Sequence, residues 1–338
     1  MSAYQNKKPL VSICIPAYNA EKTVVSTLQS IINQTYQNLE VIIVDNDSTD
    51  DTSAILQKFR DPRIKIYKNS KNIGAEKNWS RCIELANGEY IAIFHANDLY
   101  MPDMVEKQVQ AFQDNPSIGA VFTIANYIND RGEVIGEHKL PVKLKGKGVY
   151  YFSEIFISTL RNGNFLMCPS AMVKSEIYKE LAPFNDEQFG TSADLDMWLR
   201  ILERHPIAIL DERLMKYRIS SSSGTLLYWN KRTERADFFF VMDHFAKSPA
   251  LTVKIEKRFW EQYEYYKKLD NVVLVKNLLK RGEINKARNL SNKTLSVNFI
   301  INSFGELNGL KQLIVAVILV FGINIGFGKY LGNVLKRV

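Results

Sequence analysis

The sequence predicts an α/β fold in which a mostly parallel sheet is flanked by helices. Short apolar, β-rich runs alternate with stretches of about 10–15 residues that have helical spacing, which is typical of parallel strands joined by crossover helices. The composition agrees with this, because 46% hydrophobic and 24% charged residues in a chain of 338 are ordinary for a folded protein with a sizeable core.

Four strands are expected among the first hundred or so residues. The first run, LVSICI, stops at Pro16, and Asn87-Gly88 marks the end of the helix that precedes the fourth strand. The segment Ser48-Thr49-Asp50 is expected to cap the helix that follows the second strand. The predicted strands are 10–15, 39–44, 64–67 and 90–94, and the predicted helices are 20–32, one that runs to residue 59, and 75–86.

Beyond Met101 the pattern becomes mixed α+β. A helix is expected over 102–114, with strands near 120–123 and 170–173. A further helix over 193–203 has a buried stripe with i, i+4, i+7 spacing, and Thr191 or Ser192 is placed to cap it. Asp194 then lies in its first turn, where the helix dipole favours an ionised carboxylate. Asp196 and Arg200 are expected to form an i,i+4 pair on the surface.

The last third of the chain differs in composition, being helical, aromatic and basic. Residues 1–225 hold 25 Lys and Arg against 27 Asp and Glu, whereas residues 226–338 hold 19 against 9. We therefore predict a domain over 1–225, a helical basic extension over 226–305 and an apolar, basic tail over 306–338. An excess of positive charge at one end indicates an anionic membrane or nucleic acid as partner.

The tail favours the membrane over nucleic acid. Residues 313–323 (LIVAVILVFGI) are continuously apolar, with Lys311 before them and Lys329 and Lys336 after them. Because this run is at or below the length that spans a bilayer, we expect an interfacial helix with cationic ends. A buried helix of the globular core is the alternative. The first apolar run is too short for a signal peptide, so we expect the protein in the cytoplasm, peripheral on the inner face of the cell membrane.

Polar clusters follow the first, second and fourth predicted strands. They contain Pro16, Tyr18 and Asn19, then Asp45 and Asn46, then His95, Asn97 and Asp98. Ligands in parallel sheets bind beyond the carboxyl ends of the strands, so these clusters are expected to meet at one binding edge. No G-x-G-x-x-G or P-loop pattern is present, which disfavours dinucleotide and ATP sites. The three cysteines and four histidines are too scattered for a zinc site, and each cysteine is expected to be a buried thiol.

Five segments in this order make the chain resemble the family 2 glycosyltransferases, which have the glycosyltransferase-A fold. The segments are VSICIPAYNAE (11–21), VDNDSTDDT (44–52), NIGAEKNW (72–79), GEYIAIFHANDLYMPD (88–103) and TSADLDMWLR (191–200), and Tyr217-Arg218 also looks typical. The resemblance covers about residues 9–220. It implies a nucleotide-binding, mostly parallel sheet fused to a mixed acceptor region, here with a C-terminal helical extension, and an inverting enzyme of the hexosyltransferase type.

The resemblance also implies roles for single residues. Asp98 is expected to ligate Mn²⁺ or Mg²⁺, which prefers oxygen ligands and neutralises a leaving diphosphate. Asp194 is the expected general base for the acceptor hydroxyl. The expected contacts of the nucleotide-sugar, with UDP favoured, are Pro16, Tyr18, Asn19, Asp45, Asn46, Lys77 and Asn97. The acceptor would be a saccharide or a lipid-linked saccharide in surface polysaccharide or glycolipid assembly.

Two departures from the family pattern keep rival functions open. His95-Ala96-Asn97-Asp98 stands where the family often has D-x-D-D, and Asn46 stands where it usually has aspartate, opposite the base of the nucleotide. One rival is therefore a non-catalytic sugar-nucleotide-binding protein of the same fold. A second is a nucleotidyltransferase, although the glycine-rich loop of that class is missing after the first strand. A nucleic-acid-binding protein is the weakest rival, and we expect no nucleic-acid partner.

Overall fold

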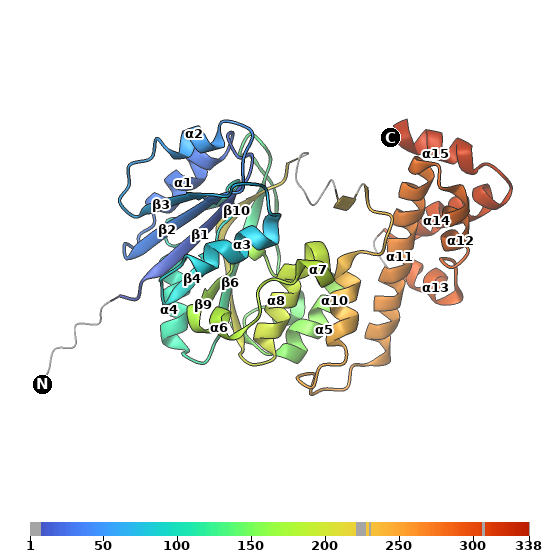
Figure 1. The fold of residues 1–338 in the computed structure, drawn as a ribbon. Coiled ribbons are helices and arrows are strands. Elements are labelled where there is room, and N and C mark those ends of the chain that lie inside the picture. Colours follow the sequence, from blue (N-terminus) through green and yellow to red (C-terminus); the bar gives the residue numbers. More distant parts are fainter. Residues whose placement is uncertain (1–7, 221–227, 230, 306–307, 338) are drawn as a thin grey trace, which may run out of the picture. The chain divides into compact units, whose positions relative to one another are not determined.

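The computed structural model describes residues 8–220, 228–229, 231–305 and 308–337, and the chain forms two compact units (Figure 1). The sheet unit comprises residues 1–158, 164–220 and 248–250. The helical unit comprises residues 159–163, 221–247 and 251–338.

The sheet unit is built on one mixed sheet with the strand order β3-β2-β1-β4-β9-β6-β10-β5, to which β7 and β8 add through β6 and β10. Strands β1 to β4 are parallel, as the sequence predicted, whereas β9 runs antiparallel between β4 and β6. The bounds are β1 Val11–Ala17, β2 Leu39–Asp45, β3 Ile64–Lys68, β4 Tyr90–Ile93, β5 Leu99–Tyr100, β6 Ala120–Ile128, β7 Val134–Glu137, β8 Val149–Tyr150, β9 Met172–Lys174 and β10 Ile207–Arg218.

Helices cover both faces of the parallel part of this sheet. On one face, alternate residues of β1 such as Ile13 and Ile15 share a core with Val24 and Leu28 of α1. On the other face, the thiol of Cys14 donates to the carbonyl of Cys82 in α3. Burial on both faces explains why β1 and β2 read as continuous apolar runs. The helices are α1 Val24–Ile32, α2 Thr52–Leu56, α3 Ala75–Glu84, α4 Met104–Asp114, α6 Ser175–Glu180, α7 Asp186–Phe189 and α8 Ala193–Leu202, together with α5 Phe152–Asn162, which ends in the helical unit.

The helical unit is organised around the long helix α11 (Lys257–Arg281). Gly282 ends it in the left-handed region at φ 79°, and the N–H of Glu283 bonds back to the carbonyl of Leu278. Gly332 allows α15 to pack against α11, since a Cβ there would lie 2.4 Å from the carbonyl oxygen of Leu279. The other helices are α10 Asp237–Phe245, α12 Ile284–Ser291, α13 Val297–Gly305, α14 Gly309–Asn324 and α15 Gly328–Arg337.

Several local predictions are confirmed only in part. The N-cap of α2 is Asp51, which makes no side-chain capping bond, but the carboxylate of Asp50 accepts from the N–H of Thr52, the first residue of this helix, at 3.0 Å. Ser192 is the N-cap of α8, likewise without a side-chain bond. The Asp196–Arg200 pair exists at 2.9 Å, but Asp196 is buried because α8 packs with most of its surface covered.

The prediction for the cysteines is confirmed, whereas several elements were not predicted. The three cysteines are free and buried. The sequence did not predict β5, β7, β8, β10 or α5. Over the described part of the chain, no helix is long and apolar enough to cross a membrane.

Candidate active site

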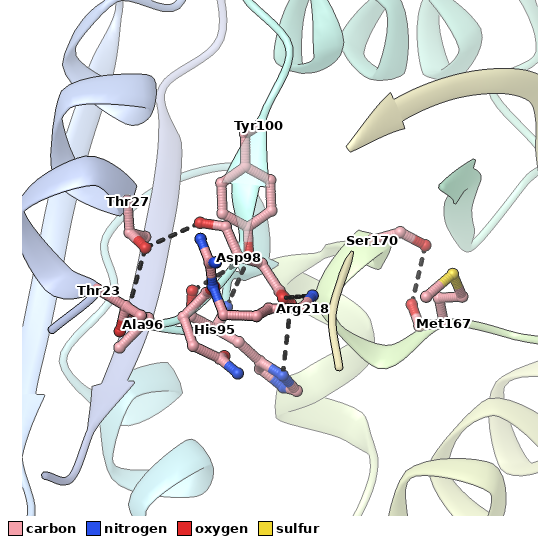
Figure 2. A network of polar contacts seen from close by, with 10 residues as sticks. Thr23, Thr27, His95, Ala96, Asp98, Tyr100, Met167, Ser170 and Arg218 are labelled. Atoms are coloured by element: carbon pink, nitrogen blue, oxygen red, sulfur yellow. Dashed lines mark hydrogen bonds and ion pairs between the residues drawn. The ribbon is translucent and has the colours of Figure 1, made fainter. Parts of the chain in front are cut away.

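The loop that follows β4 carries the buried carboxylate of Asp98. Helix α1 holds this loop, since Thr27 donates its hydroxyl to the carbonyls of Ala96 (3.0 Å) and Asp98 (2.8 Å), and Thr23 donates to the carbonyl of Ala96 (2.9 Å). Figure 2 shows these threonines on one side of Asp98 and Arg218 on the other. The position of the carboxylate is therefore set by α1 and by the end of β10.

The two oxygens of Asp98 have different surroundings. Oδ1 accepts from the backbone N–H of Arg218 at 2.7 Å. Oδ2 has no hydrogen-bond partner among the described residues, although the side chain is fully buried. Burial raises the pKa of this carboxyl to about 7, against the opposing effects of the Arg218 N–H and charge. A buried oxygen with an open lone pair is costly unless another group occupies it.

His95 lies beside the open oxygen of Asp98. Its Nδ1 is 3.9 Å from Asp98 Oδ2, and its Nε2 has no hydrogen-bond partner in the described chain. Burial lowers the pKa of His95 to about 4, so the imidazole is neutral and keeps a free lone pair at neutral pH. The described residues contain no cluster of three or more His, Cys, Asp or Glu that could hold a metal ion. One open carboxylate oxygen still fits Mg²⁺ or Mn²⁺, which commonly take one or two carboxylates, the rest being phosphate and water oxygens.

Asp45 and Asn46, at the end of β2, hold two loops in place. Asp45 accepts from the N–H of Ser48 and from the hydroxyl of Ser53. Asn46 is buried and donates to Asn72 Oδ1 and to the carbonyl of Gly74, both at 3.0 Å. The side-chain oxygen of Asn46 accepts from Asn69 Nδ2 and from the N–H of Ile73. Both hydrogens and the oxygen of this amide are therefore engaged within the protein.

The other candidate donor contacts lie around this edge. Pro16 is half-buried near the end of β1, and Tyr18 after it is 48% exposed, so its ring is accessible. Asn19 adopts the left-handed region (φ 47°) and its side-chain oxygen accepts from the N–H of Thr49. Lys77 of α3 is exposed, 3.8 Å from Glu187. Asn97 is half-buried, and its carbonyl accepts from Arg218.

Asp194 lies in the first turn of α8, as predicted. Its Oδ1 accepts from the N–H of Leu195 at 2.7 Å and its Oδ2 from Asn164 at 3.4 Å. Desolvation raises the pKa of this carboxyl to about 6, and the charge of Glu76 contributes in the same direction. A carboxylate with such a pKa is ionised at neutral pH and is a better proton acceptor than an ordinary aspartate.

Tyr217 lies within the electrostatic influence of both Asp98 and Asp194. The pKa of this phenol is raised to about 12 by burial, by the charge of Asp98 and by that of Asp194. The pKa of the buried Cys168 thiol is raised by the same two carboxylates, after burial. Both aspartates therefore lie near one region of the sheet unit. A nucleophile activated by one carboxylate and a leaving group bound at the other would react there.

Arg218 is a site residue whose role the sequence did not reveal. Its buried guanidinium donates to the carbonyls of Asn97 (2.8 Å) and Asn129 (2.8 Å), in addition to the backbone contact with Asp98. It thus joins the loop after β4 to the turn after β6. The Tyr217-Arg218 pattern drew attention to the position, but these carbonyl contacts appear only in the fold.

The sequence profile described as Glycosyl transferase family 2 matches residues 12–182. The protein belongs to this family. An uncharacterized glycosyltransferase of Methanocaldococcus jannaschii is 34% identical to it over 65% of this chain and 74% of the relative. A UDP-Glc:α-D-GlcNAc-diphosphoundecaprenol β-1,3-glucosyltransferase of Escherichia coli is 28% identical over 71% of this chain and 88% of its own.

Solved structures show the same glycosyltransferase-A fold for this family 2 enzyme. Staphylococcus aureus TarS, in complex with UDP, aligns with a TM-score of 0.53 at 15% identity, over 94% of this chain and 92% of its own. The mannosyltransferase of Pyrobaculum calidifontis, in complex with GDP-Man and Mn²⁺, aligns with a TM-score of 0.54 at 16% identity, over 98% and 87%. These structures confirm the predicted fold class, and the family profile confirms that the protein is a glycosyltransferase.

Proposed function

We propose that this enzyme transfers a sugar from a nucleotide diphosphate-sugar to an acceptor hydroxyl with inversion at the anomeric carbon. The observation that carries the proposal is the pair of carboxylates near Tyr217, one with an open buried oxygen and one with a raised pKa. In domain terms, we assign the reaction to residues 1–225, with 226–305 as a helical extension and 306–338 as a tail.

Asp194 acts as the general base. Its ionised carboxylate takes the proton of the acceptor hydroxyl while that oxygen forms a bond to the anomeric carbon. The bond from the anomeric carbon to the diphosphate oxygen breaks at the same time, on the opposite face of the sugar. A single displacement of this kind inverts the configuration, and it needs no protein acid because the diphosphate leaves as a stable anion.

Asp98 is the residue that would hold a divalent cation, through its open Oδ2, with the neutral His95 beside it. Mn²⁺ or Mg²⁺, when bound, supplies positive charge to the diphosphate. Arg218 positions the loop that carries Asp98, and we assign to Asn97 in that loop a hydrogen bond to the donor ribose. Around the nucleotide we assign contacts to Pro16, Tyr18, Asn19 and Lys77, with Asp45 and Asn46 supporting the loops that line it.

UDP is the favoured nucleotide and a lipid-linked saccharide the favoured acceptor. The E. coli relative is named for UDP-Glc and for a diphosphoundecaprenol acceptor, and TarS was solved with UDP. The mannosyltransferase bound to GDP-Man supports a nucleotide diphosphate-sugar in general. We propose a role in surface polysaccharide or glycolipid assembly, on the inner face of the cell membrane.

The test is calorimetric titration of the protein with a panel of nucleoside diphosphates, with and without Mn²⁺. We expect one nucleotide to bind in a Mn²⁺-dependent way and Asp98→Asn to lose that dependence, because the amide nitrogen or oxygen replaces a charged ligand. Asp103→Asn, which changes a partly exposed aspartate that pairs with Lys107, is the matched control. Binding of no nucleotide under any metal would contradict the proposal.

The alternative is a non-catalytic sugar-nucleotide-binding protein of this fold, and Asn97 and Asn46 are the residues that favour it. Such a protein would bind the nucleotide but would not turn over the donor. Slow donor hydrolysis that disappears in Asp194→Asn, with nucleotide affinity unchanged, excludes it. A nucleotidyltransferase would instead release diphosphate from a nucleoside triphosphate. An assay that supplies the triphosphate in place of the sugar donor measures this release.

A further inference from the structure

Three adjacent helices of the helical unit expose large apolar side chains to solvent. Helix α14 packs against both α13 and α15, and each of the three has one side in the core of this unit. We call the exposed residues of these helices and of the turn between α14 and α15 the apolar face: Val297, Ile300, Ile301, Phe304, Leu310, Ile314, Ile318, Phe321, Ile325, Phe327, Tyr330 and Val334, each at least 41% exposed. Soluble monomers rarely expose so many large apolar residues on neighbouring elements, so such a face marks an interaction site.

The central helix, α14, is apolar both on its buried side and on its exposed side. Leu313, Ala316, Leu319 and Ile323 are buried in the core of the unit. Leu310, Ile314, Ile318 and Phe321 recur every three or four residues and are 52–63% exposed. A residue in this second set adds nothing to the core, so its apolar character needs a different explanation. One side of α14 is held by protein and the other is available to an apolar partner.

The surroundings of the apolar face are basic. Residues 284–338 contain seven Lys and Arg and a single acidic residue. Lys276, Lys280 and Lys311 form no ion pair with any residue that the structure describes. Burial lowers the pKa of Lys276, and the charges of Lys280 and Lys311 lower it further, so the three ammonium groups lie close together. A cluster of like charges without carboxylates is stabilised by an anionic partner.

We infer that the apolar face of α13, α14 and α15 docks on an anionic lipid bilayer, with the helices lying in the interface. The exposed side chains enter the acyl boundary, and the lysines meet the anionic headgroups. A second copy of the chain would bring two basic surfaces together, and the resulting repulsion disfavours it as the occupant. This inference deepens the proposed setting at the membrane and rests on it, but vesicle binding needs neither donor nor acceptor.

The experiment is co-sedimentation of the full chain with vesicles of phosphatidylcholine, alone or mixed equally with phosphatidylglycerol. We expect binding to the mixed vesicles and about tenfold weaker binding by the double variant Ile318→Gln, Phe321→Gln, because two inserted side chains become polar. Val134→Gln with Ile135→Gln, which removes two exposed apolar residues from β7 of the sheet unit, is the matched control and should bind as the wild type does.

A second variant keeps the test decisive if the first one unfolds. Lys276→Gln, Lys280→Gln, Lys311→Gln leaves the apolar face intact and should reduce the preference for phosphatidylglycerol and its sensitivity to salt. Light scattering of each protein reports its oligomeric state. Absence of vesicle binding, binding unaffected by both variants, or a dimer that the Ile318 and Phe321 changes dissociate would each overturn the inference. Transfer of the sugar to a water-soluble acceptor is measured separately. It tests the proposed reaction independently of vesicle binding.

Discussion

At the scale of single residues, the proposed mechanism depends on two carboxyl groups whose pKa values are raised above the ordinary value of aspartate. Burial is the main cause for both, which places the pKa of Asp98 near 7 and that of Asp194 near 6. The two groups are nevertheless suited to different tasks. Asp98 is fully buried and has one open oxygen, so it is only about half ionised at neutral pH until a cation binds. Asp194 is only half-buried and bonds to Leu195 and Asn164, so it is ionised without one.

The pH dependence of transfer follows from Asp194. A base must be deprotonated to accept a proton, so the rate at saturating donor and Mn²⁺ should fall about tenfold per pH unit below about 6 and level off above it. Saturation matters, since bound cation keeps Asp98 ionised and leaves Asp194 as the titrating group. The measurement is the initial rate between about pH 4.5 and about pH 8, a range that includes the pH at which Asp194 is expected to titrate.

Two variants test this assignment. Glu76→Gln removes a neighbouring negative charge, so the midpoint should move to lower pH while the plateau rate is retained. Asp194→Asn should lose about a hundred- to ten-thousandfold in rate, the usual contribution of a general base. A profile whose midpoint is the same in wild type and Glu76→Gln, together with a fully active Asp194→Asn, would assign the base elsewhere.

At the scale of elements, the carboxyl end of β10 carries Arg218 and connects two parts of the sheet unit. The side chain reaches the loop after β4 and the turn after β6, and its backbone N–H reaches Asp98. A guanidinium with its fork of donors can bond several carbonyls at once, which an ammonium group cannot do in the same geometry.

Arg218→Lys is therefore expected to loosen the loop that carries Asp98. The lost contacts should lower the free energy of unfolding by about 1–3 kcal/mol and weaken Mn²⁺-dependent nucleotide binding more than metal-free binding. Denaturant unfolding and calorimetry measure the two effects. Arg213→Lys on the same strand, whose exposed pair with Glu137 is 2.9 Å long, is the control and should change stability by less than about 1 kcal/mol. Equal effects of both changes would contradict this role of Arg218.

How much the sequence predicts also differs between elements. Among the parallel strands, β1, β2 and β4 were predicted because their residues are buried on both faces and polar clusters follow them, so pattern and position agree. Strand β10 was missed because Asp211, Glu212 and Arg213 interrupt its apolar pattern where its register with β6 shifts. Strands β5 and β8 have two residues each, too few for any periodicity.

The same limit applies to the site. Asp98 and Asp194 were predicted as site residues because they follow a strand end and begin a helix, and because the family resemblance implies their roles. The hydrogen bonds of the Asn46 side chain were not predicted, since they depend on the loop of residues 69–74 folding back onto the end of β2. The contacts of Arg218 likewise join segments far apart in the chain. Hydropathy alone could not show that α14 has both a buried and an exposed apolar side.

At the scale of the whole molecule, the chain consists of two compact units with separate cores. In the helical unit, the buried guanidinium of Arg232 pairs with both oxygens of Asp270 and stacks over Trp229, 4.3 Å from the centre of that ring. Asp270 also accepts from the N–H of Ala236. This pair holds the segment before α10 against α11.

Asp270→Ala should therefore damage one unit and spare the other. It leaves Arg232 buried without its partner, which costs about 3–5 kcal/mol, a large part of the stability of a unit of this size. We expect thermal unfolding to split into two transitions, with vesicle binding lost at the lower one while Mn²⁺-dependent nucleotide binding persists to the higher. Glu261→Ala, which removes an exposed pair with Lys257, is the control and should leave a wild-type melt. If nucleotide binding and vesicle binding instead disappear together in Asp270→Ala, the two units fold as one cooperative body, and the helical unit contributes to the donor site through stability.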